Sequence, residues 1–275
     1  NFGIDFAGGT LMELRAKNGT ADISLLRNIA EHLGVGDVGV QSFGNKSDVT
    51  LRFGVQPGGD AAQAAAVDKV KTAVTDGYEI RRVETVGPSV SAELVQSGTL
   101  GVVLSIIAVL AYLWFRFEWQ FAISAVIATM HDLLLTVGFF SLTQLEFNTT
   151  SIAAILTIVG YSLNETVVVL DRIREMMRKY KKMPTDQLID ISINAVLPRT
   201  LMTATTVLLA LFALVVFGGQ VIRSFSLAMT WGVCVAVYSS IFICSPMMIY
   251  LGLRTEGSAR ETADAKEQAA AEAAR

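Results

Sequence analysis

The sequence predicts a multi-pass α-helical membrane protein with a smaller α+β domain at its N-terminal end. Hydrophobic residues make up 52% of the 275 residues and charged residues only 17%, and the mean hydropathy is +0.49. Such values exceed those of an ordinary soluble domain. The apolar residues gather after about residue 87, whereas the part before it is polar and alternates between strand and helix patterns.

The polar part, residues 1–87, has the pattern of a compact α+β domain. Period-two alternation predicts strands, and apolar residues three and four apart predict helices. The expected order is strand, helix, strand, strand, helix, strand, over residues 10–16, 21–33, 38–43, 48–53, 61–74 and 78–86. The two middle strands form a hairpin around residues 44–46. This βαββαβ order is typical of a ferredoxin-like sandwich.

Five apolar runs follow, over residues 90–115, 121–142, 149–170, 195–217 and 221–253. Each exceeds the roughly 20 residues that cross about 30 Å of hydrocarbon. Pro88 suits a first helical turn, so we expect the domain to continue directly into the first span. Pro246 predicts a kink in the last span, and Gly101, Gly138 and Gly232 are compatible with close helix packing.

We therefore expect a domain over residues 1–87, a five-helix bundle over 88–254 and a disordered tail over 255–275, which has mixed charges and no large apolar residue. No signal peptide opens the chain. Because a polar domain outside the cell needs an earlier anchor, we expect a spanning helix to precede residue 1.

The orientation follows from the basic residues near the spans. Six of them crowd the segment between the third and fourth spans, namely Arg172, Arg174, Arg178, Lys179, Lys181 and Lys182, whereas residues 143–148 contain no Lys or Arg. Basic connections stay in the cytoplasm. This predicts a periplasmic N-terminal domain and a cytoplasmic C-terminal tail.

Composition argues against several other functions. The net charge of -3 and the pI of about 5.5 give no basic patch for nucleic acid. His32 and His131 are the only histidines and belong to no zinc-binding motif, so we expect no metal and no cofactor.

Glu165 is the most informative candidate residue, because a carboxyl group inside an apolar span is costly and is usually kept for a function. Arg199 lies a few residues into the next span, at a comparable depth. We expect the two to pair at least part of the time, with Glu165 gaining its proton when they separate. Asn164 and Thr166 add polar groups beside the acid. The alternative is a static ion pair that only fixes the helix register.

His131 and Asp132 are a second polar pair, near the middle of the second span. Adjacent helical residues point about 100° apart, so we expect one to face the bundle and the other to reach a different helix. Asp132 needs a donor such as a hydroxyl from a neighbouring span. His131 is either a proton relay or an ordinary hydrogen-bonding residue.

Several ordered motifs resemble the SecF family, the smaller partner of bacterial SecD/SecF protein-export complexes and a branch of the resistance-nodulation-division superfamily. They are GIDFAGGT at residues 3–10, VGPSVSAEL at 86–94, His131-Asp132, GYSLNET at 160–166, DRIRE at 171–175 and Arg199-Thr200. The resemblance covers about residues 1–254. One departure is Glu165, where the family usually has Asp between Asn and Thr or Ser.

The resemblance implies six spans, of which this chain lacks the first, in the bacterial cytoplasmic membrane. It implies a subunit, not an enzyme, that uses the proton motive force to assist translocation and release of unfolded polypeptides. The implied partners are SecD, the SecYEG channel, YajC or YidC, and membrane lipid. Glu165 and Arg199 match the positions assigned to proton transfer. Two rivals remain: a proton-coupled exporter of lipids or small hydrophobic molecules, and a passive assembly subunit.

Overall fold

The computed structural model describes residues 1–42, 45–219 and 222–253. The described chain divides into two compact units. The first contains residues 1–101 together with 146–149, and the second contains the remaining described residues. The predicted tail over 255–275, residue 44 of the predicted hairpin turn, and residue 221 at the start of the last predicted span lie outside the described residues.

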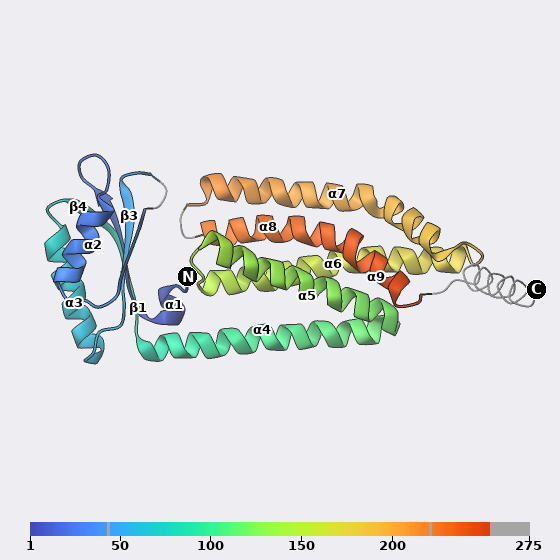
Figure 1. Cartoon of the computed structure of the whole chain (residues 1–275), viewed down its shortest axis with the longest axis horizontal. Helices are drawn as coiled ribbons and strands as arrows, with labels where there is room; N and C mark the ends of the chain where they lie inside the picture. Colours follow the sequence, from blue (N-terminus) through green and yellow to red (C-terminus); the bar gives the residue numbers. More distant parts are fainter. Residues whose placement is uncertain (43–44, 220–221, 254–275) are drawn as a thin grey trace, which may run out of the picture. The chain divides into compact units, whose positions relative to one another are not determined.

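The first unit is built on an antiparallel sheet with the strand order β2-β3-β1-β4. Its strands are β1 (Gly9–Ala16), β2 (Val38–Ser42), β3 (Asp48–Phe53) and β4 (Tyr78–Val86). Helices α2 (Ile23–His32) and α3 (Gly59–Val74) cover one face of this sheet (Figure 1). The expected order of strands and helices is confirmed, with boundaries shifted by at most two residues.

The core of this unit lies between the sheet and its two helices. Met12 and Leu14 of β1 stand opposite Leu51 and Val49 of β3, and all four are fully buried. Side chains two apart on a strand point to the same face, so this alternation directs the apolar side of the sheet toward the helices. The sequence pattern that predicted the strands is therefore also what forms the core.

The N-terminal segment contains a short helix, α1 (Ile4–Ala7), that the sequence pattern did not indicate. The backbone N–H of Gly3 donates to the carbonyl oxygen of Phe147 at 2.8 Å. The Asp5 carboxylate accepts from the backbone N–H and the hydroxyl of Thr149, at 2.9 and 2.7 Å. Thr149 is the first residue of α6 (Thr149–Lys179), so Asp5 satisfies a free N–H at that helix terminus.

The segment GIDFAGGT at residues 3–10 contains a glycine pair, and the structure gives a steric reason for the second of these glycines. Gly9 has a φ of 111°, and a side chain there would collide with the backbone of Phe53 and Gly54. Only glycine adopts this conformation without strain and lets β1 approach β3 so closely.

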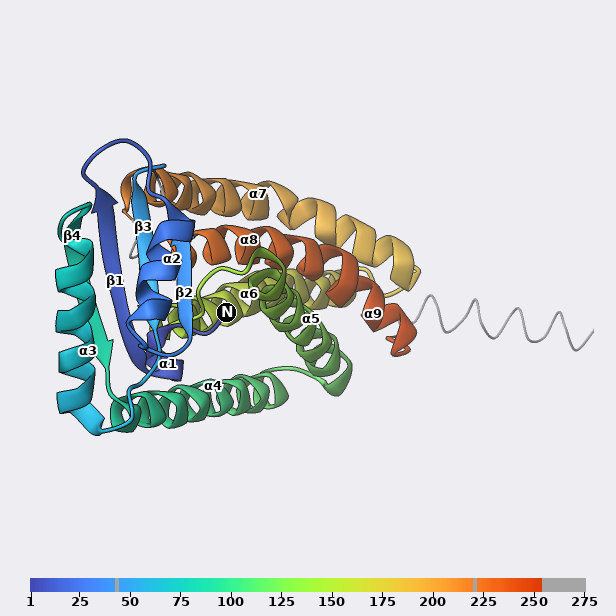
Figure 2. The same ribbon diagram turned by 60° about the vertical axis from the view of Figure 1, so that its left-hand side comes forward.

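Among the residues that the structure describes, five helices are long and apolar enough to cross a membrane, as expected. They are α4 (Pro88–Arg116), α5 (Trp119–Thr143), α6, α7 (Thr185–Phe217) and a last span that begins with α8 (Arg223–Ser239). α4 starts at Pro88, directly after β4, which confirms the predicted continuation. Figure 2 shows α5, α6 and α8 next to one another in the bundle. The chain is therefore a multi-pass membrane protein.

The basic segment after the third span is helical for most of its length. α6 continues to Lys179, and only residues 180–184 connect it to α7. Ile173 and Met176 of α6 and Leu188 and Ile189 of α7 are buried in the main core of the bundle. Because this apolar stripe persists beyond the hydrocarbon-length run, both helices extend past the span that hydropathy indicates.

The last span is interrupted where Pro246 predicted a break. α8 ends at Ser239, a π-helical segment η1 occupies Ser240–Cys244, and α9 (Ser245–Tyr250) follows. Proline cannot donate to the carbonyl four residues before it, and such a disruption favours a π-bulge or kink. Among the three glycines expected at helix contacts, only Gly232 has a neighbour at its Cβ position in the described chain, the side chain of Ile158.

Candidate functional site

Glu165 lies in the middle of α6 and is 3% exposed. Its Oε1 accepts a hydrogen bond of 3.1 Å from the hydroxyl of Thr203 on α7. The same hydroxyl lies 3.1 Å from the carbonyl oxygen of Arg199 and 3.0 Å from that of Thr200. A hydroxyl donates one proton, so three acceptors compete for it. The Thr203 hydroxyl is therefore not committed to Glu165 alone.

Arg199 lies one helical turn before Thr203 on α7, so its backbone is near Glu165 at a comparable depth, as predicted. The Arg199 side chain, however, is exposed. No ion pair joins Glu165 and Arg199, both of which the structure describes. The expected ion pair between Glu165 and Arg199 is not formed here, because the Arg199 side chain lies on the face of α7 that points away from the bundle.

The other polar residues expected beside Glu165 are divided between two faces of α6. Asn164 is exposed, whereas Thr166 is fully buried. The hydroxyls of Thr166, Tyr161 and Thr200 are buried without a hydrogen-bond partner in the described chain. Buried hydroxyls of this kind are uncommon in folded proteins.

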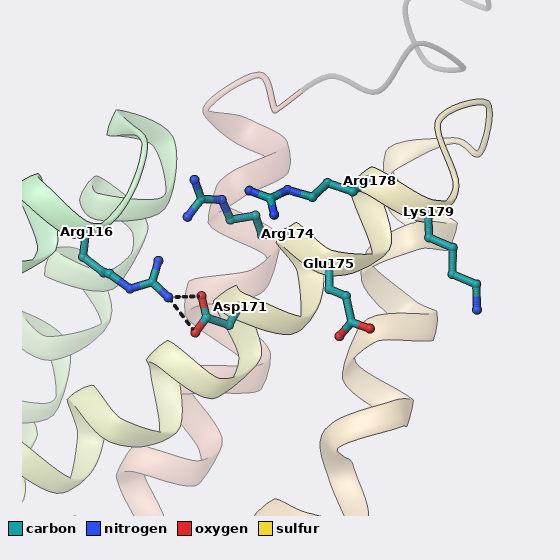
Figure 3. A pocket seen from close by; sticks show the side chains of 6 residues that line it. All are labelled: Arg116, Asp171, Arg174, Glu175, Arg178 and Lys179. Atoms are coloured by element: carbon teal, nitrogen blue, oxygen red, sulfur yellow. Dashed lines mark hydrogen bonds and ion pairs between the residues drawn. The ribbon is translucent and has the colours of Figure 1, made fainter.

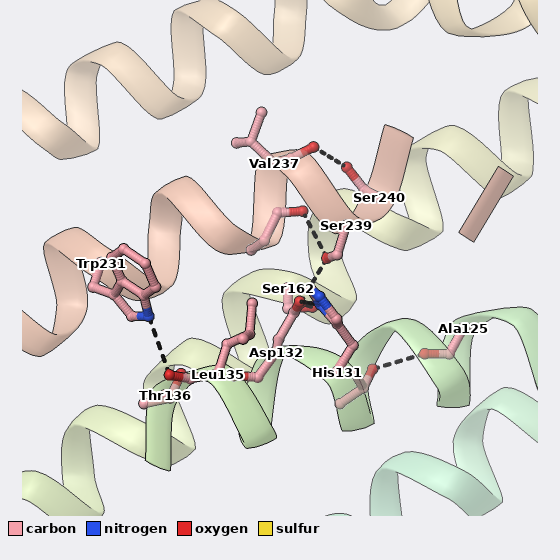
Figure 4. A network of polar contacts seen from close by, with 12 residues as sticks. Ala125, His131, Asp132, Leu135, Thr136, Ser162, Trp231, Val237, Ser239 and Ser240 are labelled. Carbon is pink, nitrogen blue, oxygen red and sulfur yellow. Dashed lines mark hydrogen bonds and ion pairs between the residues drawn. The ribbon is translucent and has the colours of Figure 1, made fainter. Parts of the chain in front are cut away.

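Asp132 forms the centre of a dense polar network between three helices (Figure 4). It lies on α5 and is 1% exposed. Its Oδ2 accepts from the Ser162 hydroxyl of α6 at 2.5 Å and from the Ser239 hydroxyl of α8 at 2.8 Å. The hydroxyl donors that the buried carboxyl required are thus present, and the prediction is confirmed.

His131 also contacts Asp132, the residue next to it on α5. Its Nδ1 lies 3.1 Å from the Oδ1 of Asp132, and its ring centroid is 6.3 Å from that of Tyr238 on α8. The expectation that the two neighbours would reach different helices was wrong, since both contact α8. The imidazole folds back along the helix toward Asp132, which the 100° separation of the Cβ atoms does not prevent.

Two residues of these sites escaped the sequence reasoning. Thr203 lies four residues after Arg199, and this spacing on a helix could have indicated a shared face. Ser239 carries no such signal, because a serine in an apolar helix usually bonds its own backbone. Ser162 lies three residues before Glu165 on α6, and its hydroxyl donates to Asp132.

The buried carboxyls of Asp132 and Glu165 are groups that can bind a proton. Within the described ranges, no three His, Cys, Asp or Glu side chains gather closely enough to hold an ion. What remains is a pair of buried carboxyls, one on α5 and one on α6, with Ser162 one turn before Glu165.

Comparison with known proteins gives a consistent result over almost the whole chain. The family described as Protein export membrane protein SecD/SecF, C-terminal, matches residues 66–254, and the SecD/SecF GG motif matches residues 1–20. The chain is 43% identical over 252 residues to Protein translocase subunit SecF of Rickettsia bellii, covering 90% of this chain and 82% of the relative.

Single-chain SecDF proteins also match. Protein translocase subunit SecDF of Brucella abortus is 43% identical, with 97% of this chain and 35% of the relative covered. The crystal structure of SecDF from Thermus thermophilus, a translocon-associated membrane protein, superposes with a TM-score of 0.82 at 34% identity, covering 92% of this chain and 35% of that one. The chain thus spans about a third of these longer proteins. It belongs to the SecD/SecF family of protein-export membrane proteins.

Proposed function

We propose that this chain is the SecF-type subunit of a Sec translocase accessory complex in the bacterial inner membrane. It pairs with a SecD-type partner and uses the proton motive force to assist translocation and release of unfolded polypeptides. Support comes from relatives named translocase subunits and from SecDF proteins, in which a matching region is continuous with a longer chain. SecYEG, with YajC or YidC, completes the proposed assembly.

The first unit serves in this proposal as a periplasmic domain of the ferredoxin-like class. Its support is the βαββαβ order together with the antiparallel strand order β2-β3-β1-β4. The orientation rests on the basic residues at the end of α6, which favour the cytoplasmic side.

Glu165 is the proposed proton carrier. The observation that supports this role best is a buried carboxyl whose hydrogen-bond donor, the Thr203 hydroxyl, also lies within reach of two backbone carbonyls. A carboxyl with so little fixed support exists in either protonation state without the rearrangement of a large network. Protonation and release at this position change the charge between α6 and α7, which is how proton flow drives helix movement.

Arg199 is the proposed charge partner, reached after a change in side-chain conformation. An exposed guanidinium inside an apolar span is costly against lipid. We therefore assign the outward face of α7 to contact with the SecD-type partner. In this arrangement the partner shields Arg199, and movement of α7 relative to α6 alternates Glu165 between Thr203 and Arg199.

The passive-subunit alternative requires Glu165 and Arg199 to fasten α6 to α7. The structure offers little support for it, because the two side chains form no ion pair among the described residues. The exporter alternative uses the same acid but a different cargo. We favour polypeptide export because the relatives named here are protein translocase subunits.

The deciding experiment compares Glu165→Gln with Glu165→Asp in the assembled complex. We expect the Glu165→Gln variant to lose gradient-dependent translocation into inverted membrane vesicles, because glutamine cannot bind and release a proton. The Glu165→Asp variant should retain it. Co-purification with the SecD-type partner verifies assembly of both variants. Full gradient-dependent export by an assembled Gln variant would exclude Glu165 as the carrier.

A further inference from the structure

Another polar site lies toward the C-terminal end of α6, where two spans end. Six charged residues line an open pocket of about 550 Å³ in the second unit: Arg116, Asp171, Arg174, Glu175, Arg178 and Lys179. Arg116 is the last residue of α4, and the others follow the apolar part of α6. Figure 3 shows Arg174 and Arg178 extending toward the side from which Arg116 enters.

The two acids in this pocket are already paired. Nη2 of Arg116 donates to both carboxylate oxygens of Asp171, at 2.9 and 3.1 Å. Nη1 of Arg172, outside the pocket, donates to Glu175 at 2.7 Å. Arg174, Arg178 and Lys179 form no ion pair with any residue that the structure describes. The pocket therefore keeps an excess of positive charge.

The positions of the unpaired cations make this excess unfavourable without a ligand. Arg174 and Arg178 are four residues apart on α6, and like charges at this spacing repel each other and destabilise a helix. Two guanidinium groups side by side also form the geometry that binds a phosphate through several charge-assisted hydrogen bonds. An anion between them would remove the repulsion.

The level of the pocket points to the membrane surface. Trp114, Phe115 and Trp119 lie beside Arg116 in the sequence and are 67%, 89% and 52% exposed. Exposed aromatic residues at the end of a span are typical of the headgroup region of a bilayer. Basic pockets between spans at this level are suited to acidic lipid headgroups.

We propose that this pocket binds a phosphate group, the chemistry shared by phospholipid headgroups and free phosphate. An anionic phospholipid is the source that its level in the membrane favours. Arg174 and Arg178 hold the phosphate, and Arg116 shapes the pocket through its bond to Asp171. The proposal needs only a membrane-spanning chain and is independent of proton transfer at Glu165.

The competing interpretation is that these basic residues only set the orientation of the chain. A matched pair of variants separates the two readings. Arg174→Gln with Arg178→Gln removes two charges from the pocket, and Lys181→Gln with Lys182→Gln removes two charges from the adjoining connection, outside the pocket. Both changes weaken the general attraction to acidic membranes equally.

The first measurement is lipid retention. The complex is reconstituted with phosphatidylcholine and a minor fraction of phosphatidylglycerol, extracted into mild detergent, and examined by native mass spectrometry. We expect the arginine variant to lose about tenfold in phosphatidylglycerol retention and the lysine variant less than about twofold. Equal losses in both variants would overturn the pocket in favour of general surface charge.

The second measurement distinguishes free phosphate. Delipidated complex is titrated with inorganic phosphate at constant ionic strength while thermal unfolding is followed. Stabilisation that depends on Arg174 and Arg178, without lipid retention, identifies free phosphate as the source. Absence of both effects in the wild-type protein refutes the proposal. The arginine variant should be at least as stable as wild type without ligand, since repulsion is relieved, and this verifies that it folds.

Discussion

The buried carboxyls of Asp132 and Glu165 lie in the same bundle but differ in how they are held. Asp132 accepts from hydroxyls on two other helices and contacts His131. Among the described residues, Glu165 accepts from the Thr203 hydroxyl, which other acceptors share. Burial alone therefore does not identify a proton carrier. We expect the number of hydroxyl donors from other helices to separate an acid that fixes the helices from one that is able to change charge.

The largest effect that tests this comparison is expected for Asp132→Ala. The change removes the acceptor of the buried Ser162 hydroxyl and leaves the Ser239 hydroxyl with the carbonyl oxygen of Ala236, and we expect a loss of about 2 to 3 kcal/mol in the free energy of unfolding. Glu165→Ala, the matched change, removes one shared hydrogen bond and should cost about 1 kcal/mol or less. Reversible unfolding in mixed detergent micelles measures both. Equal losses would show that the two acids do not differ in structural role.

The next effect tests the donors instead of the acids. Ser239→Ala removes a hydroxyl that lies 2.8 Å from Oδ2 of Asp132 and 3.2 Å from the carbonyl oxygen of Ala236, and it should cost about 1 kcal/mol. Thr203→Ala removes a donor shared by three acceptors and should cost about 0.5 kcal/mol or less, because two of those acceptors are backbone carbonyls beside it on α7. The same unfolding assay compares the two variants. A larger loss for Thr203→Ala would reverse the assignment of a loosely held Glu165.

Sequence reasoning located both acids because charge in an apolar run is visible in one dimension. It also required a hydroxyl donor for Asp132, since an unsatisfied carboxyl at that depth is too costly. It could not identify Ser239 or predict that Arg199 faces outward. Those contacts depend on the rotation of each helix about its axis, which is set by packing between spans and by the residues that surround them.

The fold was predictable to a similar depth. Period-two alternation gave the four strands, and Pro246 gave the break in the last span. α1 was missed because four residues carry no periodicity, and its position depends on bonds to residues 147–149, far away in the sequence. The extension of α6 and α7 was missed because hydropathy measures the length of the lipid contact and not the length of the helix.

The smallest effect concerns an acid outside the membrane, Asp48, whose partner is a cation. Its two carboxylate oxygens accept from Nε and Nη2 of Arg15, at 2.6 and 3.0 Å. The hydrogen bond from Arg15 lowers the pKa of Asp48, although partial burial opposes this shift. A lowered pKa means that the pair stabilises the fold fully above the unfolded-state pKa of about 3.9.

The stability that this pair contributes is lost as the pH falls through the lower pKa of the folded state. Asp48→Asn should therefore unfold at a lower denaturant concentration than wild type at pH near 7, and the difference should shrink below about pH 3. The effect is smaller than that of Ser239→Ala, because Arg15 remains partly exposed and water screens the pair. A difference that stays constant across this pH range would show that the Asn variant acts through packing and not through the lost charge. Asp48 would then act like Asp132, whose proposed role is also to hold neighbouring elements together. Only the number of hydrogen-bond donors would then distinguish these two acids from Glu165.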